Sequence, residues 1–313
     1  MERQGTNRPD LAQIALEYST DLGFLMGAEI FPFFYVDEEE ATFDKIATSQ
    51  ATKVVGNIKI GRKGTAAEIE HETTEDSYKC ETYGLKEFTD YREKANLDKR
   101  FNTQAGKTRL LTRHVMIEYE KRVKALAFDA ASTFVSYTGA VGTEWNNSGN
   151  PYNDIQDAKL TLIQNLGGVI DPGYELCLAI SDKVAKEVRK NSNVKALLSG
   201  GQYSDDDMAK ISNERLAGIL DVDKVFSSPA QDGGSDIWDD EYALLYLRRT
   251  DEDLEAGVQC ARTMVWTVVE RSPYDVTTWG SEDPEGIWVR VRHHVDEKVL
   301  TAAAGYLMSN IHT

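Results

Sequence analysis

The stretch SYKCETYGLKEFTDYREKANLD, residues 77–98, gathers one cysteine, three tyrosines, one glycine and several charged residues in a short window. Such a mixture is typical either of a chemical site or of a strand that continues into another element. Its first part, SYKCETY at 77–83, has the composition of a β-strand. Upstream, TKVVGNIKI at 52–60 has the same character. We therefore predict two strands on either side of one connection.

The connection itself, GRKGTAAEIEHETTED at 61–76, is polar and has no hydrophobic period. A long structureless connection is uncommon inside a compact domain and usually has a function. We expect a long two-stranded arm that projects from the body of the protein. Because an isolated hairpin is only marginally stable in water, such an arm needs another subunit to lie on.

A long helix is predicted from about Gly106. Apolar residues recur there at steps of three or four, which indicates one buried helix face. That face consists of Leu111, Val115, Tyr119, Val123 and Leu126. The ion pairs Glu118–Arg122 and Glu120–Lys124 are expected on the exposed side. About 28 residues at 1.5 Å per residue give a helix of about 40 Å, which favours a structural spine over a short core helix.

Residues 154–250 alternate between helix and strand patterns and are long enough to bury a core of their own. One predicted strand there is YELCLAIS at 174–181, whose last residue caps the next helix. Near the C-terminus, IWVRVRHHV at 287–295 alternates as a half-buried strand does. The adjacent His293 and His294 therefore point to opposite faces and cannot share a metal ion.

Composition narrows the functional classes. The chain has 313 residues, with 52 acidic against 35 basic side chains, so its net charge is −17. Such a charge favours solubility and argues against a broad phosphate-binding surface. The three cysteines are far apart and are predicted to be reduced, buried and structural. No apolar run approaches the roughly 18 residues of a membrane span, and we expect synthesis in a cytoplasm.

Motifs for catalysis are absent from the sequence. It contains no HExxH, no GxSxG and no GxxxxGK[ST], and Asp205–Asp207 lacks the spacing of a calcium loop. We predict no catalytic residue, no metal ligand and no cofactor. The open alternative is an enzyme that uses the 154–250 block, with the arm serving oligomerisation.

The order of these parts resembles the major capsid proteins of tailed double-stranded-DNA bacteriophages, whose fold is shared with encapsulins. Three groups of residues support the resemblance. The first is Tyr83-Gly84-Leu85 followed by Asp90, Glu93 and Asn96. The second is Trp145 ahead of Asn150-Pro151 and DIQDA at 154–158. The third is Trp266 with Pro273, the strand at 287–295 and GYLMSN at 305–310.

The resemblance implies an α+β fold in four parts. An N-terminal arm occupies 1–40, and an extended β-hairpin loop occupies 41–84. A peripheral domain with the spine helix takes 85–140 and 256–313, and an α/β axial domain takes 141–255. Copies of the chain are expected to assemble as hexamers and pentamers into an icosahedral head around double-stranded DNA. The alternative within this fold is an encapsulin-type nanocompartment shell.

The resemblance also implies where subunits meet, and it makes the opening stretch architecture, not a catalytic site. Extended-loop contacts are expected from Ile58, Lys59, Arg62, Lys63, Glu68 and Glu70. The loop rejoins the peripheral domain at Tyr83, Gly84, Leu85, Asp90 and Glu93, where Gly84 permits a turn. The N-terminal arm is expected to make contact through Phe31, Phe33, Phe34 and Tyr35, whose rings need partners that a monomer does not supply.

The expected partners follow from the same resemblance. They are further copies of the chain, a portal protein and packaged double-stranded DNA bound without sequence specificity. Because only about 40 residues precede the loop, we expect scaffolding from a separate protein. Decoration proteins are a further partner class of the family, and no membrane is expected. The location is the virion capsid, assembled in the cytoplasm of a bacterial host. A cross-link through Lys59 or Lys63, as in some relatives, lacks a supporting acid–Asn arrangement.

Overall fold

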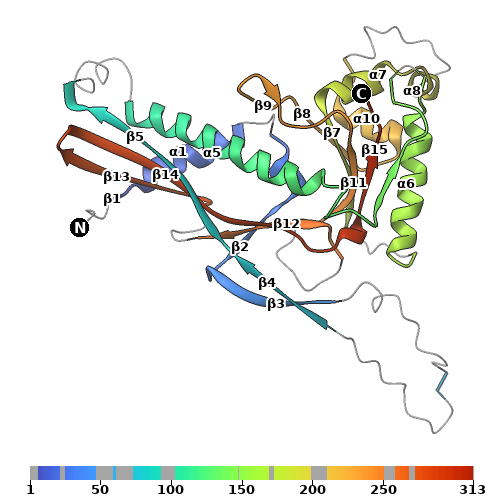
Figure 1. The fold of residues 1–313 in the computed structure, drawn as a ribbon, viewed down its shortest axis with the longest axis horizontal. Coiled ribbons are helices and arrows are strands. Elements are labelled where there is room, and N and C mark those ends of the chain that lie inside the picture. The colour runs from blue at the N-terminus through green and yellow to red at the C-terminus, as the bar shows by residue number, and fades with distance from the viewer. Residues whose placement is uncertain are drawn as a thin grey trace.

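The structure is a computed structural model. It describes residues 6–21, 25–46, 59–60, 73–92, 103–146, 148–168, 173–198, 210–249, 258–267 and 272–312. Figure 1 shows two β-sheets beside one long helix, with a two-stranded ribbon that projects away from both sheets. None of the helices in the described ranges combines the length and the apolar character that a membrane crossing needs.

The first sheet is built around one long strand, β14 (Glu285–Val299). The first part of β14 lies between β13 (Tyr274–Glu282) and β5 (Glu81–Asp90), both antiparallel to it. Its last residues pair with β12 (Ala261–Trp266). The predicted alternation along β14 holds from Val289 to Arg292, where the valines are buried and the arginines partly exposed. It fails at both ends, because Ile287 is only partly buried and His294 is buried.

Two helices cover one face of the first sheet. They are α1 (Pro9–Asp21) and α5 (Thr103–Ala127), and the latter is the predicted spine helix. Their apolar side chains meet those of the sheet in one cluster: Leu11, Ala12, Ala15, Leu111, Val115, Met116, Tyr274, Val276, Val289 and Val291. On the predicted core face of α5, Leu111, Val115, Tyr119 and Val123 are buried and Leu126 is partly buried.

The second sheet has five strands. Their order is β6 (Thr138–Ala140), β15 (Gly305–Ser309), β11 (Ala243–Arg248), β7 (Glu175–Ser181) and β8 (Lys224–Ser228). The pair β7–β8 is parallel, whereas β11 runs antiparallel to both of its neighbours. All but the first residue of β7 and the last residue of β11 are buried, which is typical of strands covered on both faces.

Four helices accompany the second sheet (Figure 1): α6 (Pro151–Asn165), α7 (Asp182–Lys190), α8 (Ser192–Leu197) and α10 (Asn213–Leu220). The sequence predicted the start of α7 correctly, because the Ser181 hydroxyl accepts a hydrogen bond from the Val184 amide at 3.2 Å. A small hairpin of β9 (Gln231–Asp232) and β10 (Ser235–Asp236) precedes β11.

The expected boundary of the peripheral domain is wrong at its C-terminal end. We assigned all of 256–313 to that domain, but the chain crosses to the second sheet after β14. The short 3-10 turn η1 (Ala302–Ala304) leads into β15, which lies between β6 and β11. The physical reason is burial, because Leu307 and Met308 are almost fully enclosed there. The second sheet therefore needs strands from both sides of the spine helix in sequence.

The expected N-terminal arm at 1–40 also differs from the structure. Within its described residues, α1 packs against the first sheet and β2 (Phe33–Val36) joins that sheet as a parallel neighbour of β12. A two-residue strand, β1 (Thr6–Asn7), pairs with β13. The apolar face of α1 finds its partner within the same chain. The described part of this segment belongs to the body of the subunit.

Candidate assembly surfaces

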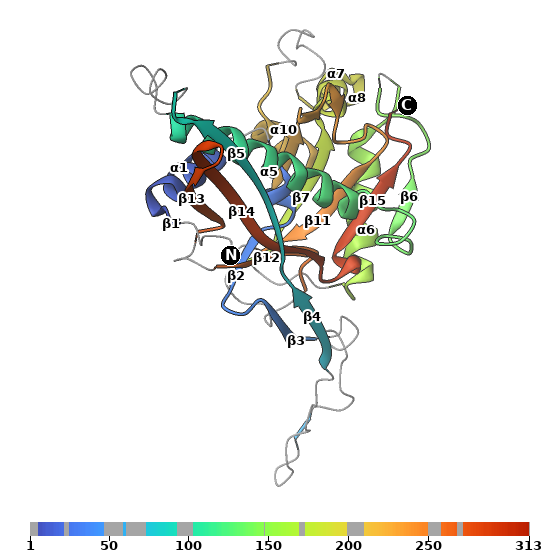
Figure 2. The ribbon, with the colours of Figure 1, turned by 60° about the vertical axis from the view of Figure 1, so that its left-hand side comes forward.

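The projecting ribbon consists of β3 (Glu40–Ile46) and β4 (Thr73–Lys79), paired from Glu40↔Lys79 to Ile46↔Thr73. Figure 2, turned by 60°, shows it extending away from both sheets as well. The first strand lies earlier than the predicted 52–60. Of that stretch only Lys59 and Ile60 are described, and they lie outside any strand. The other expected loop contacts, Ile58, Arg62, Lys63, Glu68 and Glu70, lie outside the described residues.

The base of the ribbon is fixed to the body by charge and by packing. Asp76 accepts hydrogen bonds from Lys45, at 2.7 Å, and from Lys298 on β14. Partial burial raises the pKa of Asp76, but the hydrogen bonds from the two lysines and from the Ser77 amide together hold that pKa below its ordinary value. Tyr78 is buried beside Phe43, with ring centroids 6.4 Å apart. The root of the ribbon is thus held while its far end projects.

Cys80 separates β4 from β5, where the chain passes from the ribbon into the first sheet. The residue is 2 % exposed, and burial raises the pKa of its thiol to about 12. Burial likewise raises the pKa of Cys177 and of Cys260 to about 12. All three cysteines are free and buried, as the sequence predicted. None carries the thiolate that nucleophilic chemistry would require.

The predicted turn at Gly84 is wrong, because Gly84 lies inside β5 opposite Arg292. A Cβ placed there would come within 2.9 Å of both the Val291 carbonyl oxygen and the Arg292 Cγ. Glycine is needed for the close approach of two strands and not for a turn.

The other predicted junction residues have varied surroundings. The ring of Tyr83 lies 3.6 Å from the guanidinium carbon of Arg122. Leu85 is 42 % exposed, and Asp90 accepts a hydrogen bond from the Arg92 amide at 2.6 Å. Glu93 lies outside the described residues.

The substitution Gly84→Ala is expected to destabilise the subunit by about 1–3 kcal/mol, because the new methyl group meets a backbone carbonyl that cannot move freely. Denaturant unfolding of the purified subunit measures the loss. Gly106→Ala is the matched control, since a Cβ there meets nothing within 4 Å. Equal stability of Gly84→Ala and wild type would contradict the close approach.

Of the expected N-terminal contact residues, only Tyr35 is exposed, at 41 %. Phe31 is buried in the core. Phe33 lies 5.7 Å from the Tyr119 ring, and Phe34 lies beneath the Arg262 guanidinium, with 5.5 Å between that group and the ring centroid. The expectation that these rings lack partners in the monomer is therefore wrong for the three phenylalanines.

The predicted exposed ion pairs on α5 are also wrong. Glu120 is fully buried, with its carboxylate between the Gly27 amide and the Trp238 indole. Lys124 instead pairs with Asp239 at 2.5 Å. Arg122 pairs with Glu297 at 2.7 Å. The helical period of the sequence predicts which charged residues lie one turn apart. It does not predict which other elements of the fold pack on those residues.

Sequence patterns missed several exposed apolar side chains. A hollow of about 560 Å³ between β5, α5 and the β9–β10 hairpin has Leu85, Leu110 and Ile117 among its lining residues. Leu110 is 48 % exposed, whereas the next residue along the helix is buried. Val135, Leu160 and Leu197 are each more than half exposed elsewhere. Only the tertiary packing distinguishes these positions from core ones.

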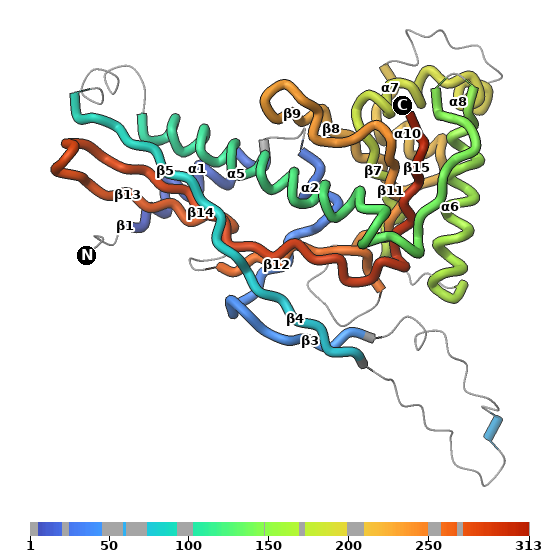
Figure 3. Tube along the Cα trace, viewed as in Figure 1, coloured from blue at the N-terminus to red at the C-terminus, as the bar shows by residue number. Residues whose placement is uncertain are grey.

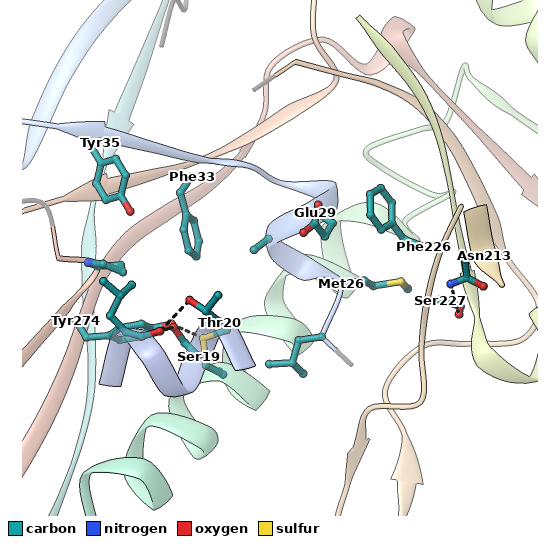
Figure 4. Close-up of a pocket in the computed structure, with 15 residues that line it drawn as sticks. Ser19, Thr20, Met26, Glu29, Phe33, Tyr35, Asn213, Phe226, Ser227 and Tyr274 are labelled. Atoms are coloured by element: carbon teal, nitrogen blue, oxygen red, sulfur yellow. Dashed lines mark hydrogen bonds between the residues drawn. The ribbon is translucent and has the colours of Figure 1, made fainter. Parts of the chain in front are cut away.

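A cavity of about 490 Å³ lies between the layers (Figure 4). Tyr35, Tyr274 and Ser19 line one side, and Asn213 and Ser227 of the second sheet's layer line the other. Two of its polar side chains engage each other, since Asn213 donates to Ser227 at 3.2 Å. Nowhere in the described ranges do three His, Cys, Asp or Glu side chains converge as a metal site would require.

Comparison with known proteins identifies the fold of the chain. No protein-family model and no curated protein sequence matches the chain. A phage-related protein from Bordetella bronchiseptica superposes with a TM-score of 0.71 over 99% of this chain and 98% of that chain, at 14% identity. The capsid of cyanophage P-SCSP1u superposes with a TM-score of 0.58 over 90% of this chain and 86% of that chain, at 8% identity. The chain has the fold of phage capsid proteins.

The phage capsid fold of this chain is also found in an encapsulin. The SrpI encapsulin of Synechococcus elongatus superposes with a TM-score of 0.54 over 91% of this chain and 89% of that chain, at 10% identity. The expected α+β architecture, with 25 residues in the spine helix, is thereby confirmed. In this fold the ribbon and the exposed apolar residues are the candidate assembly surfaces.

Proposed function

We propose that the chain is the major capsid protein of a tailed phage, forming hexamers and pentamers that close into an icosahedral head around double-stranded DNA. The observation that carries the proposal is the match of 90% of the chain to a phage capsid, with ribbon, spine helix and both sheets in one subunit. A ribbon that projects from its own body is suited to contact with a neighbouring copy. Many such contacts together make a shell far more stable than any single contact.

The parts of the subunit receive these roles. The first sheet with α5 acts as the peripheral domain, and the second sheet acts as the axial domain at the capsomer centre. The loop that begins with β3 lies over a neighbour and uses Ile58, Lys59, Arg62, Lys63, Glu68 and Glu70. Tyr35 contributes from the N-terminal segment. The exposure of Ile60, at 55 %, and of Leu85 supports apolar contacts in addition to charged ones.

Charge supports enclosure of DNA without tight binding. The net charge of −17 keeps the wall from adhering to phosphates, since neutralising them requires many lysines and arginines. The further partners in this proposal are a separate scaffolding protein, a portal protein and decoration proteins. The head would assemble in the bacterial cytoplasm and end as the virion capsid.

The second candidate is an encapsulin-type compartment, favoured by the superposition on the SrpI encapsulin. Such a shell holds protein cargo, whereas a phage head holds DNA. Particles from the native source that contain nuclease-protected DNA would favour the phage head. Particles that contain one abundant protein and no DNA would favour the compartment.

To test the proposal, the full chain is expressed alone and together with the candidate scaffolding protein encoded by a neighbouring gene. Electron microscopy of the largest gradient fraction is expected to show closed shells or capsomer-sized rings. Small uniform oligomers in both cultures would contradict the proposal and would direct attention to the cavity of Figure 4.

A further inference from the structure

One buried carboxylate connects three segments of the chain. Oε1 of Glu120, on α5, accepts a hydrogen bond from the Gly27 amide at 2.5 Å. Oε2 accepts one from the Trp238 indole N–H at 2.9 Å. Gly27 begins the short helix α2 (Gly27–Ile30), which leads into the first sheet. Trp238 precedes β11 of the second sheet.

The site is tightly enclosed. Glu120 has no exposed surface, and Trp238 is 1 % exposed with its ring 5.1 Å from that of Phe128. A Cβ at Gly27 would lie 2.9 Å from Oε1, so only glycine leaves room for the carboxylate. Figure 3 traces α2 alongside α5 at this level of the molecule. Burying an ionised carboxylate is costly unless it is paired and hydrogen-bonded, and otherwise the group takes up a proton.

No cation among the described residues offsets this charge. The charged groups on the surrounding elements pair with one another: Glu29 of α2 with Arg248, Lys121 of α5 with Glu118 and Asp232, Lys124 of α5 with Asp239, and Asp240 with Lys183. Of the other titratable groups, Tyr119 precedes Glu120 on α5, and His293 of β14 packs against the Tyr119 ring. Glu120 is held by neutral donors alone.

We propose that Glu120 is a proton-operated tie between the two sheets, which holds both Gly27 and Trp238 when ionised and releases one of them when protonated. The chemistry is a proton equilibrium with no other reactant. An ionised carboxylate has two acceptor oxygens, one for each donor. Protonation converts one oxygen into a hydroxyl, which is a weak acceptor facing an N–H donor. The proposal concerns the subunit itself and does not depend on shell assembly.

The relevant pH range is near neutrality. Burial raises the pKa of Glu120 from 4.5 to about 7, although the Gly27 and Trp238 hydrogen bonds oppose the shift. A carboxyl whose folded-state pKa is raised favours folding below its unfolded pKa, and this contribution is lost as pH rises through about 7. His293 stays neutral throughout this range, because burial lowers its pKa to about 3. Between pH 4.5 and pH 7, Glu120 is therefore protonated in the folded subunit but ionised in the unfolded chain.

Difference infrared spectroscopy of the purified full chain between pH 5 and 9 tests the proposal. We expect the carbonyl band of a protonated carboxyl group to appear with a midpoint near 7 in wild type. The band should be absent from Glu120→Gln and retained in Glu118→Gln, the matched control on the exposed face of the same helix. A band that persists in Glu120→Gln, or a wild type without one, would overturn the proposal.

A second variant covers the case in which Glu120→Gln does not fold. Trp238→Phe removes one donor and leaves the carboxyl group in place. Because the indole N–H favours the ionised form, we expect the midpoint to rise by about one pH unit, a tenfold change in proton affinity. Tryptophan fluorescence should titrate with the same midpoint in wild type, and that change should vanish in Trp238→Phe. An unchanged infrared midpoint in this variant would show that Trp238 is not tied to Glu120.

Discussion

Replacing residues 47–72 with Asn-Gly is expected to yield a folded subunit that forms no closed shells. Ile46 and Thr73 lie directly opposite each other, so a two-residue turn can join β3 to β4 without a change of register. The replaced segment contains all six predicted loop contacts. Because many weak contacts act together in a shell, we expect the yield of closed particles to fall by roughly 10²-fold or more. Electron microscopy and sedimentation measure that yield.

The variant retains the anchor of the ribbon, which makes the outcome informative. Asp76 keeps Lys45 and Lys298, and Tyr78 stays buried. The melting temperature of the isolated subunit should therefore match that of wild type. Closed shells from the shortened variant would contradict a role for this segment between subunits. A wild type that also forms no shells would instead contradict the capsid proposal itself.

His293→Phe is expected to protect the subunit against acid. The imidazole is fully buried among Phe33, Tyr119 and Tyr274, with ring centroids 5.9, 5.7 and 5.0 Å away. Neither ring nitrogen has a hydrogen-bond partner among the residues that the structure describes. Burial, helped by the charge of Arg122, lowers the pKa of His293 from 6.5 to about 3. The unfolded chain therefore takes up a proton at a pH where the folded protein does not.

The sign and size of the effect follow from proton linkage. A base with a lowered folded-state pKa stabilises the fold fully above pH 6.5, and that stability is lost as pH falls toward 3. Between pH 6.5 and 4 the wild type should lose about 3 kcal/mol that His293→Phe does not lose. At pH 7.5 the variant should gain about 1 kcal/mol, because two unpaired polar atoms are removed. Denaturant unfolding at pH 7.5, 5.5 and 4.0 gives these differences.

His114→Gln provides the control, because it removes an exposed histidine from α5. This variant should lose stability in acid as the wild type does. Glu120 titrates in an overlapping range with the opposite sign, but its contribution cancels when the variants are compared at one pH. Acid sensitivity equal to that of wild type in His293→Phe would contradict the neutral buried state of His293.

Local patterns in the sequence predicted most of the elements. The spine helix, the strand β7, the Ser181 cap and the alternation along β14 each depend on residues close in sequence. Their signals are helical period, continuous apolar runs, a capping hydroxyl and a two-residue period. These features are readable without knowledge of the partner element. The four-part order then resembled a known fold, which the structural comparison supports.

Contacts between distant segments could not be predicted in the same way. Glu120 appears in an ordinary helical charge pattern, and nothing nearby in sequence indicates that Gly27 and Trp238 enclose it. Gly84 suggested a turn because glycine favours turns, whereas its reason is the proximity of Val291 on another strand. The phenylalanines near the N-terminus appeared unpartnered because their partners, such as Tyr119, lie far along the chain. Each error concerns tertiary contacts that a single sequence does not display.

The position of β15 has a consequence for the timing of biosynthesis. β15 lies inside the second sheet, bonded to β6 on one side and to β11 on the other. While the ribosome is still translating residues before 305, β6 has no neighbour in that sheet and one edge of β11 stays open. The second sheet can close only after residue 309 has left the exit tunnel. A nascent chain is thus unable to present a finished subunit to its neighbours, which delays association until translation has passed this strand.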